Sequence, residues 1–415
     1  MSRSHRRDVS RRRFLGRAGA LAAGAVVAPS LAGGGVAHAG AAGEVVPFHG
    51  RHQAGILTPA QDRMLTAAFD VNRVQRDELI GLLREWTDAA RRLTRDGIVG
   101  TDNTDQDAPP EDTGEADGLP PSRLTVTFGF GGSLFEVDGV DRFGIAAQRP
   151  AALADLPVFA GDVIDPARSD GDLVVQACAD DPVVCFHAIR NLARIGRGTV
   201  ALRWSQSGFG RTSSTSTAQA TPRNLMGFKD GTNNLKVEEP EHVATHVWVG
   251  ADDEPAWMRD GSYMVTRRIR MLLEVWDRSS LADQELSIGR VKGSGAPLGG
   301  AREGDPVDLE ARAAGAPVIP VDAHIRLSAP SENGGAILLR RGYSFTDGID
   351  PVTNQLDAGL FFVAFQRDPR THFVAVQRRL ATDALNEYIR HTASGLYAVP
   401  PGVGPGGWIG ETLFG

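Results

Sequence analysis

Cysteine is scarce in this chain of 415 residues, which contains only Cys178 and Cys185. Iron–sulfur clusters and structural zinc sites usually take more thiolates than two, so neither is the basis of this fold. One disulfide is possible in an oxidising compartment. However, Cys178 ends an apolar run typical of a strand and Cys185 lies in a predicted helix. Because unpaired cysteines are commonly buried, we favour two buried free thiols.

The chain also lacks an excess of basic residues. Residues 1–39 hold seven of its 44 Lys and Arg and one of its 51 Asp and Glu, so the rest of the chain carries a formal charge of −13. Such a surface repels nucleic acid and anionic membranes over distances that salt does not screen. We therefore expect neither as a partner.

A long hydrophobic run is missing from the N-terminus as well. The apolar stretch through Ala25–Val27 is rich in Gly and Ala and is interrupted by Pro29, which makes it too poor for a stable membrane span. Arg11 and Arg12 precede it and "AHA" ends at Ala39, so residues 1–39 resemble a twin-arginine signal peptide. We expect export to a periplasmic or extracellular location. This route is understood to carry folded proteins, often with an inserted cofactor, so a cofactor is expected too.

Hydrophobic periodicity predicts the same order of elements twice. The first half gives strands at 63–71, 123–131, 172–178 and 199–206, with helices at 76–94 and 182–196. The second half gives strands at 261–276, 336–345, 359–367 and 395–399, with helices near 281–290 and 374–390. Strand, helix, strand, strand, helix, strand is the ferredoxin-like order. We predict an α+β fold with two ferredoxin-like domains, at 53–212 and 220–413, joined by a Ser/Thr-rich link.

Asp230 stands between two glycines in "GFKDGTNN" (227–234). Asp-Gly followed by polar residues is ordinary turn chemistry, because Asp bonds its own backbone and Gly takes positive φ freely. The alternative is a functional carboxylate that Gly227 and Gly231 aim by letting the backbone approach a ligand closely. The other motifs decide between the two.

Two adjacent arginines lie on a predicted strand, "LLRRGYSF" (338–345). Arg340 and Arg341 must point to opposite faces, because side chains alternate along a strand. One of them therefore faces a largely buried side. A buried guanidinium needs an anion or another compensating partner.

Asp383 falls on the apolar face of the helix predicted at 374–390, three residues after Leu380. A carboxylate in that position needs a partner. A histidine that binds iron through one ring nitrogen would provide it through the other nitrogen. Pairing with a neighbouring arginine such as Arg379 is the alternative, since buried acids are usually paired.

Three motifs occur together behind the export signal: "GFKDGTNN", "AHIR" (323–326) and "LLRRGYSF". In this order and spacing the chain resembles the dye-decolorising (DyP-type) peroxidase family from about residue 50 to residue 413. The signal and the mature start make it similar to the exported branch associated with iron uptake. The resemblance implies a dimeric α+β-barrel architecture with one haem b, bound in the second domain.

The resemblance also implies roles for individual residues. Asp230 and Arg340 would form the distal catalytic pair, His324 would be the proximal iron ligand, and Asp383 would hydrogen-bond to it. Gly231 would lie beside the haem, and Arg341 or Arg326 would approach a propionate. For His324 alone, a satisfied half-buried histidine is the plainer interpretation.

The function implied is a haem-dependent peroxidase that reduces hydrogen peroxide and oxidises dye-like or phenolic donors in one-electron steps. The alternative is a haem-handling protein of an iron-uptake system, which releases iron from haem and works with a permease and a lipoprotein. A haem-free binding module is a third option, against which the polar set of His324, Arg340 and Asp383 argues. Family habit suggests a homo-oligomer.

Overall fold

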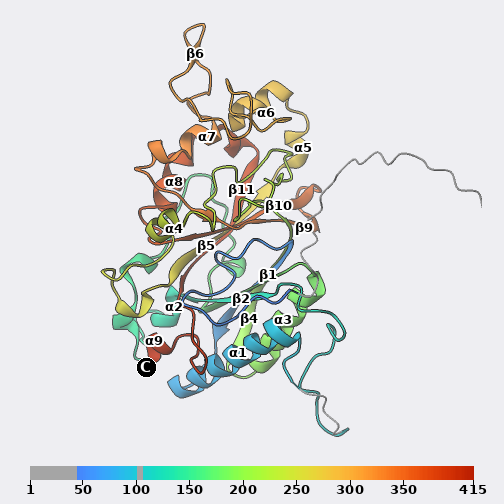
Figure 1. Ribbon diagram of the computed structural model, residues 1–415, viewed down its shortest axis with the longest axis vertical. Helices are drawn as coiled ribbons and strands as arrows, with labels where there is room; N and C mark the ends of the chain where they lie inside the picture. The colour runs from blue at the N-terminus through green and yellow to red at the C-terminus, as the bar shows by residue number, and fades with distance from the viewer. Residues whose placement is uncertain (1–43, 101–105) are drawn as a thin grey trace, which may run out of the picture. The chain divides into compact units, whose positions relative to one another are not determined.

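The computed structural model describes residues 44–100 and 106–415 (Figure 1). The export signal predicted over residues 1–39 lies outside these residues. No helix in the described part of the chain is long and apolar enough to cross a membrane.

The first half forms a four-stranded antiparallel sheet in the spatial order β2-β3-β1-β4, with two helices packed on it. Helix α1 buries Leu79, Leu83 and Trp86 at helical spacing, and it ends where Gly97 takes a left-handed conformation with φ of 79°. This is the ferredoxin-like arrangement. Its elements are β1 (Arg63–Val71), α1 (Arg76–Asp96), β2 (Thr125–Gly131), β3 (Leu173–Ala179), α3 (Pro182–Ile195) and β4 (Val200–Arg211).

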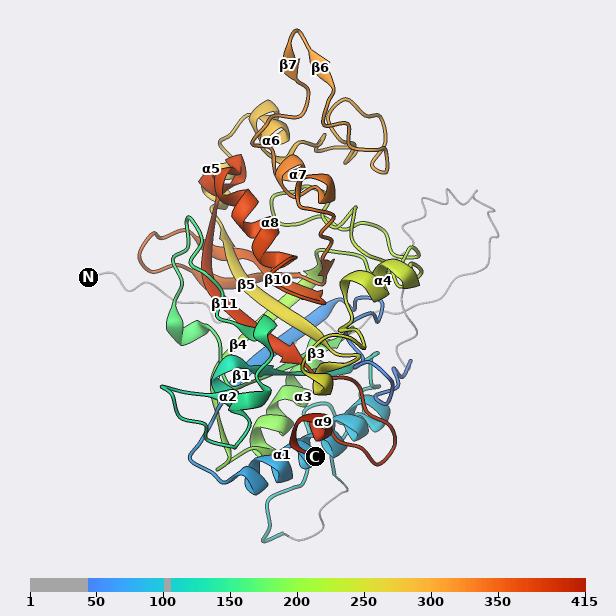
Figure 2. The same cartoon turned by 90° about the vertical axis from the view of Figure 1, so that its left-hand side faces the viewer.

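The second half repeats this topology in the order β11-β5-β10-β9. Its main elements are β5 (Ser262–Met271), α6 (Leu281–Ile288), β9 (Tyr343–Ile349), β10 (Leu356–Gln366), α8 (Phe373–Arg379) and β11 (Ile389–Val399). Shorter elements are α2 (Gly132–Phe135), α4 (Pro240–His246), α5 (Leu273–Trp276), β6 (Arg312–Ala313), β7 (Ala316–Pro317), α7 (His324–Leu327), β8 (Leu339–Arg340) and α9 (Glu411–Phe414). The hairpin of β6 and β7 projects from this half in both ribbon views (Figures 1 and 2).

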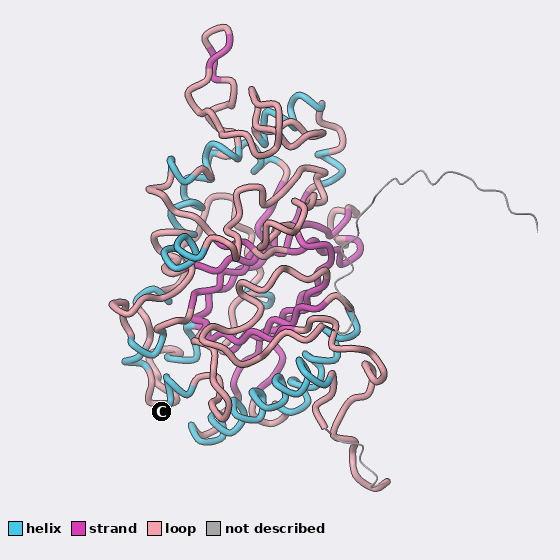
Figure 3. Tube along the Cα trace, in the orientation of Figure 1, coloured by secondary structure: helices cyan, strands magenta, loops and turns pink. Residues whose placement is uncertain are grey.

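The two halves share one sheet, which closes on itself. β2 pairs with β11 and β4 pairs with β9 across the halves, while β5 and β10 pair within the second half. One hydrophobic cluster draws Met64 from β1, Trp204 from β4, Met264 from β5, Tyr343 from β9 and Tyr397 from β11. These buried side chains form a core within the closed sheet. Helices lie outside the sheet (Figure 3). The predicted α+β fold with two ferredoxin-like halves is the observed one. Because both halves build a single sheet, the limits of two domains stay a prediction.

Several predicted elements differ in extent. The strand expected over 261–276 ends at Met271, and residues 273–276 form α5 instead. The strand expected over 336–345 is split into β8 and β9. The helix expected over 374–390 ends at Arg379 and is followed by two short 3₁₀ turns, with Asp383 between them in an extended conformation. Cys178 and Cys185 are buried and unbridged, as predicted.

Candidate active site

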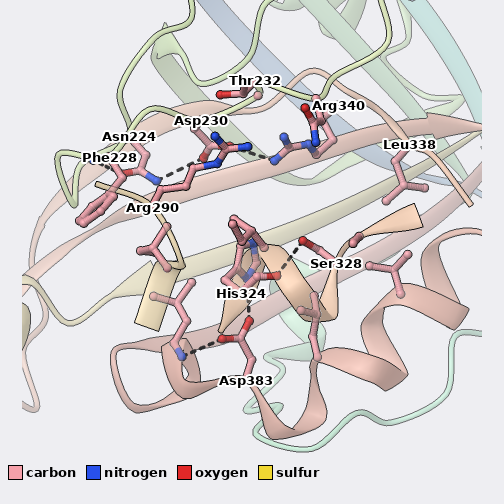
Figure 4. Close-up of a pocket in the computed structure, with 18 of the residues that line it drawn as sticks. Asn224, Phe228, Asp230, Thr232, Arg290, His324, Ser328, Leu338, Arg340 and Asp383 are labelled. Atoms are coloured by element: carbon pink, nitrogen blue, oxygen red, sulfur yellow. Dashed lines mark hydrogen bonds and ion pairs between the residues drawn. The ribbon is translucent and has the colours of Figure 1, made fainter. Parts of the chain in front are cut away.

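A cavity of about 580 Å³ lies in the second half, within the size range of small-molecule and cofactor sites. Its walls come from the 224–233 segment, strands β5 and β10, helices α7 and α8, and the loop that precedes the β6–β7 hairpin. Much of the lining is apolar, including Ile269, Met271, Ile288, Leu360 and Phe362. Polar side chains occupy two positions that face each other across the cavity (Figure 4).

His324 and Asp383 form the first polar position. His324 opens the single turn of α7, and its Nδ1 lies 2.6 Å from Oδ2 of Asp383. Asp383 is held in turn, because its Oδ1 accepts a hydrogen bond of 2.8 Å from the backbone N–H of Leu385. Burial alone would lower the pKa of His324. The charge of Asp383 and its hydrogen bond raise the pKa by more than burial lowers it, so the pKa lies above its ordinary value. With Nδ1 committed to the carboxylate, Nε2 is the ring nitrogen left for a ligand in the cavity, as in metal-binding histidines.

The alternative partner for Asp383 is excluded by this geometry. Arg379 pairs with Glu332 on the surface and not with Asp383. The prediction that Asp383 lies on the apolar face of a helix is wrong, because the helix ends at Arg379, four residues before it. Asp383 is buried for a different reason: it caps the 3₁₀ turn that follows and bonds to His324.

Asp230 and Arg340 form the second polar position. Nη1 of Arg340 donates to Oδ1 of Asp230 over 2.9 Å, and Nδ2 of Asn224 donates to Oδ2 over 3.2 Å. The backbone of Arg340 is fixed by Asn234, whose Oδ1 accepts its N–H over 2.7 Å. The carboxylate and the guanidinium are both partly exposed to the cavity, opposite His324 (Figure 4). Sequence reasoning predicted this pair together, and the structure brings the two residues together.

Gly231 lines the cavity beside Asp230, but packing explains why it is glycine. Its φ is +86°, and a Cβ added there would lie 2.8 Å from the Cα of Ser213. The crowding is therefore with the protein's own backbone. This contact alone requires glycine here, and the expected approach of Gly231 to a ligand stays a prediction.

Arg341 and Arg326 do not reach the cavity, so neither is placed to approach a propionate. Arg341 is fully buried on the opposite side of the chain from Arg340 and donates to the carbonyl of Thr58 and to Oε1 of Gln61. This confirms that adjacent arginines face opposite ways. Arg326 instead donates to backbone carbonyls, including those of Leu309 and Ile319, and so ties the hairpin loop to α7.

Arg290 is a cavity residue that sequence reasoning missed. The other cations of the lining are each paired with a carboxylate: Lys229 with Glu303, Arg267 with Asp162 and Arg340 with Asp230. Arg290 has no carboxylate partner among the described residues and donates only to the carbonyls of Gly295 and Glu303. Burial lowers its pKa. In the sequence it ends a predicted helix, where a cation is expected for the helix dipole alone, so nothing marked it.

Comparison with known proteins shows the family of the chain. The N-terminal profile of the DyP-type peroxidases matches residues 53–210, and the C-terminal profile matches residues 221–404. The chain belongs to the DyP-type peroxidase family. Its enzyme class, a haem-dependent peroxidase, is thereby confirmed, as are the expected fold class and haem cofactor.

Solved DyP-type structures and curated relatives are similar over most of the chain. Ferric DtpA from Streptomyces lividans is 45% identical, with a TM-score of 0.81 over 90% of this chain and 98% of that one. A DyP-type peroxidase from Streptomyces coelicolor is 44% identical, with a TM-score of 0.82 over the same shares. The deferrochelatase of Escherichia coli K12 is 39% identical over 95% of this chain and 94% of its own length.

Proposed function

We propose that the cavity binds one haem b, which His324 would hold through Nε2, and that Asp230 and Arg340 on the facing wall would act on hydrogen peroxide. The observation that carries this proposal is the placement of the two polar pairs on facing walls of one largely apolar cavity (Figure 4). The lining fits the group: an imidazole with a free Nε2, apolar walls for a macrocycle, and Arg290 as a cation that lacks an anion. We assign Arg290 to a haem propionate, in place of Arg341 and Arg326.

The bound haem would supply the redox chemistry of peroxide reduction. Asp230 would accept a proton from hydrogen peroxide and return it to the departing oxygen. The proton would bind Oδ2 of Asp230, which accepts one hydrogen bond from Asn224 and keeps a second lone pair free. Arg340 would stabilise the negative charge that develops as the O–O bond breaks, in a cavity where little water weakens its field. The hydrogen bond between them orients the carboxylate for this proton transfer.

The test is the absorption spectrum of the purified protein before and after one equivalent of hydrogen peroxide. A Soret band that shifts with peroxide and returns when a reducing dye is added would support the peroxidase. A protein without a Soret band, or a band that ignores peroxide, would contradict it.

Release of iron from haem is the second candidate function, favoured by the relatives named deferrochelatase at 39–40% identity. It is tested on the same sample by assaying free iron and intact porphyrin together. Metal-free protoporphyrin appearing with free iron would support it, whereas haem that stays whole through repeated turnover would count against it. By analogy with the exported branch, we propose an iron-uptake permease and a lipoprotein as partners of this protein. We also propose that the protein forms a homo-oligomer.

Asp383 should tune how tightly the haem is held. Replacing it with Asn keeps the size of the side chain but removes the charge facing Nδ1 of His324, and partners of metal-ligating histidines typically contribute 10–100-fold to metal affinity. We expect Asp383→Asn to lose haem to apomyoglobin about 10–100 times faster than the wild type. Glu387→Gln, an exposed change on the neighbouring turn, is the control. Equal transfer rates for all three proteins would remove Asp383 from the haem site.

We also propose twin-arginine export. Replacing Arg11 and Arg12 together by Lys preserves the charge but not the paired guanidinium groups of the signal. We expect the precursor to accumulate in the cytoplasm with its haem bound. Cell fractionation and immunoblotting measure this, and undiminished export of the double variant would refute dependence on that route.

A further inference from the structure

A second, smaller cavity of about 270 Å³ shares helix α8 with the haem cavity. Phe373, Val376 and Gln377 line the larger cavity, whereas Val374 and Arg378, four residues apart and so on one face, line the smaller one. Its other walls are mostly apolar and come from the 152–157 segment, the loop before α8 and β11, including Leu156, Pro157, Pro369 and Leu396. One helix, about 10 Å across, therefore separates the two cavities.

The charges at this second cavity leave one cation without a partner. Asp155 is paired with Arg149 over 2.9 Å, and Arg370 is paired with Asp368 over 2.7 Å. Arg378 is exposed at the cavity and has no carboxylate within ion-pair distance in the described part of the chain. An apolar hollow with an unpaired guanidinium suits an aromatic ring that bears an anionic group.

The charge of the rest of the chain also favours binding of an anion at this cavity. Beyond residue 39 the chain carries a formal charge of −13, so an anionic molecule is repelled from most of it. A hollow with an unpaired cation is where such a molecule would collect. The chain itself passes directly from one cavity to the other, because Phe373 lines the haem cavity and packs 6.1 Å from Phe362 of the same lining, while the next residue, Val374, lines this hollow.

We propose that this cavity binds the reducing substrate, an aromatic anion such as a sulfonated dye or a phenolic acid. The proposal rests on the proposed peroxidase function and adds to it the site and charge class of the donor. Each donor bound here would give up one electron, and a phenol also its proton. Two donors would thus supply the two electrons that, with two protons, convert one hydrogen peroxide to two waters, with the haem supplying the redox chemistry.

The experiment compares KM for two donors in the haem-loaded protein: the dianion 2,2′-azinobis(3-ethylbenzothiazoline-6-sulfonate) and neutral guaiacol. We expect Arg378→Ala to raise KM for the dianion about fivefold, the size of one exposed ion pair, and to leave KM for guaiacol within about twofold. Arg379→Ala is the matched control. It removes the same charge from the next residue of α8, which pairs with Glu332 and does not line this cavity. Equal effects of the two variants would overturn the proposal.

Ala154→Trp provides a second test that does not depend on charge. Ala154 is exposed and lines the cavity, so an indole there fills the hollow without disturbing the core. We expect KM to rise for both donors, and unchanged KM values would overturn the proposal. The spectral response to peroxide alone should stay as in the wild type in every variant. A wild type that ignores peroxide would count against the peroxidase itself, whereas a normal response with unchanged KM values would count against the donor site alone.

Discussion

Replacing His324 by Ala should leave a folded protein that no longer retains haem. The imidazole of His324 lies opposite Asp230 with its Nε2 free (Figure 4), whereas the other histidine of the lining, His391, lies on β11 with Nδ1 3.8 Å from Oδ1 of Asp162. We expect haem per chain after purification to fall at least tenfold, measured as Soret absorbance against protein concentration, because the iron loses its protein ligand.

A matched control and a rescue separate loss of the ligand from loss of the fold. His246 is a partly buried histidine outside this cavity, with Nδ1 3.2 Å from Nε2 of His372, so His246→Ala should keep its haem. Imidazole added to the His324→Ala protein should occupy the space left by the ring and restore haem binding. Full haem content and a wild-type spectrum in His324→Ala would show that another group ligates the iron.

Local patterns predicted most of the fold, because each half obeys its own periodicity. An apolar run marked β1, alternation marked β2, and the spacing of Leu79, Leu83 and Trp86 marked α1. Closure of the sheet depends instead on pairs such as β2 with β11, which are far apart along the chain. No local pattern carries that pairing. It was expected only from the resemblance to a known family.

In the candidate site, too, the sequence predicted local features but not those that depend on the assembled structure. Alternation showed that Arg340 and Arg341 point apart, but which of them faces the cavity depends on Thr58 and Gln61, both about 280 residues away in the chain. Arg290 was missed because its lack of a carboxylate partner is a property of the assembled cavity. Partners distant in sequence therefore explain the error at Arg341, whereas Arg290 and Arg326 bond to carbonyls close in sequence and only the assembled cavity shows which of them lines it.

The distal pair should control how fast the protein reacts with peroxide. We expect Arg340→Leu to slow the peroxide-induced change in haem absorption about 10²–10³-fold, because a fixed positive group no longer stabilises the departing oxygen. Asp230→Asn should slow the same step about 10²–10⁴-fold, because an amide cannot accept the proton. Stopped-flow absorbance at several peroxide concentrations gives the second-order rate constants. Both variants should keep their haem, since neither residue lies on the His324 side of the cavity (Figure 4).

The 2.9 Å hydrogen bond between Arg340 and Asp230 predicts how the two substitutions combine. Because Arg340 orients the carboxylate of Asp230, removing either residue also damages the function of the other, so their effects should not add. The double variant should be slower than either single variant, but by less than the product of the two factors. Arg379→Leu, which removes an arginine outside the cavity lining, should react at the wild-type rate. If Arg340→Leu and Asp230→Asn react as fast as Arg379→Leu, proton transfer and charge stabilisation come from other groups, and the roles assigned to this pair are wrong.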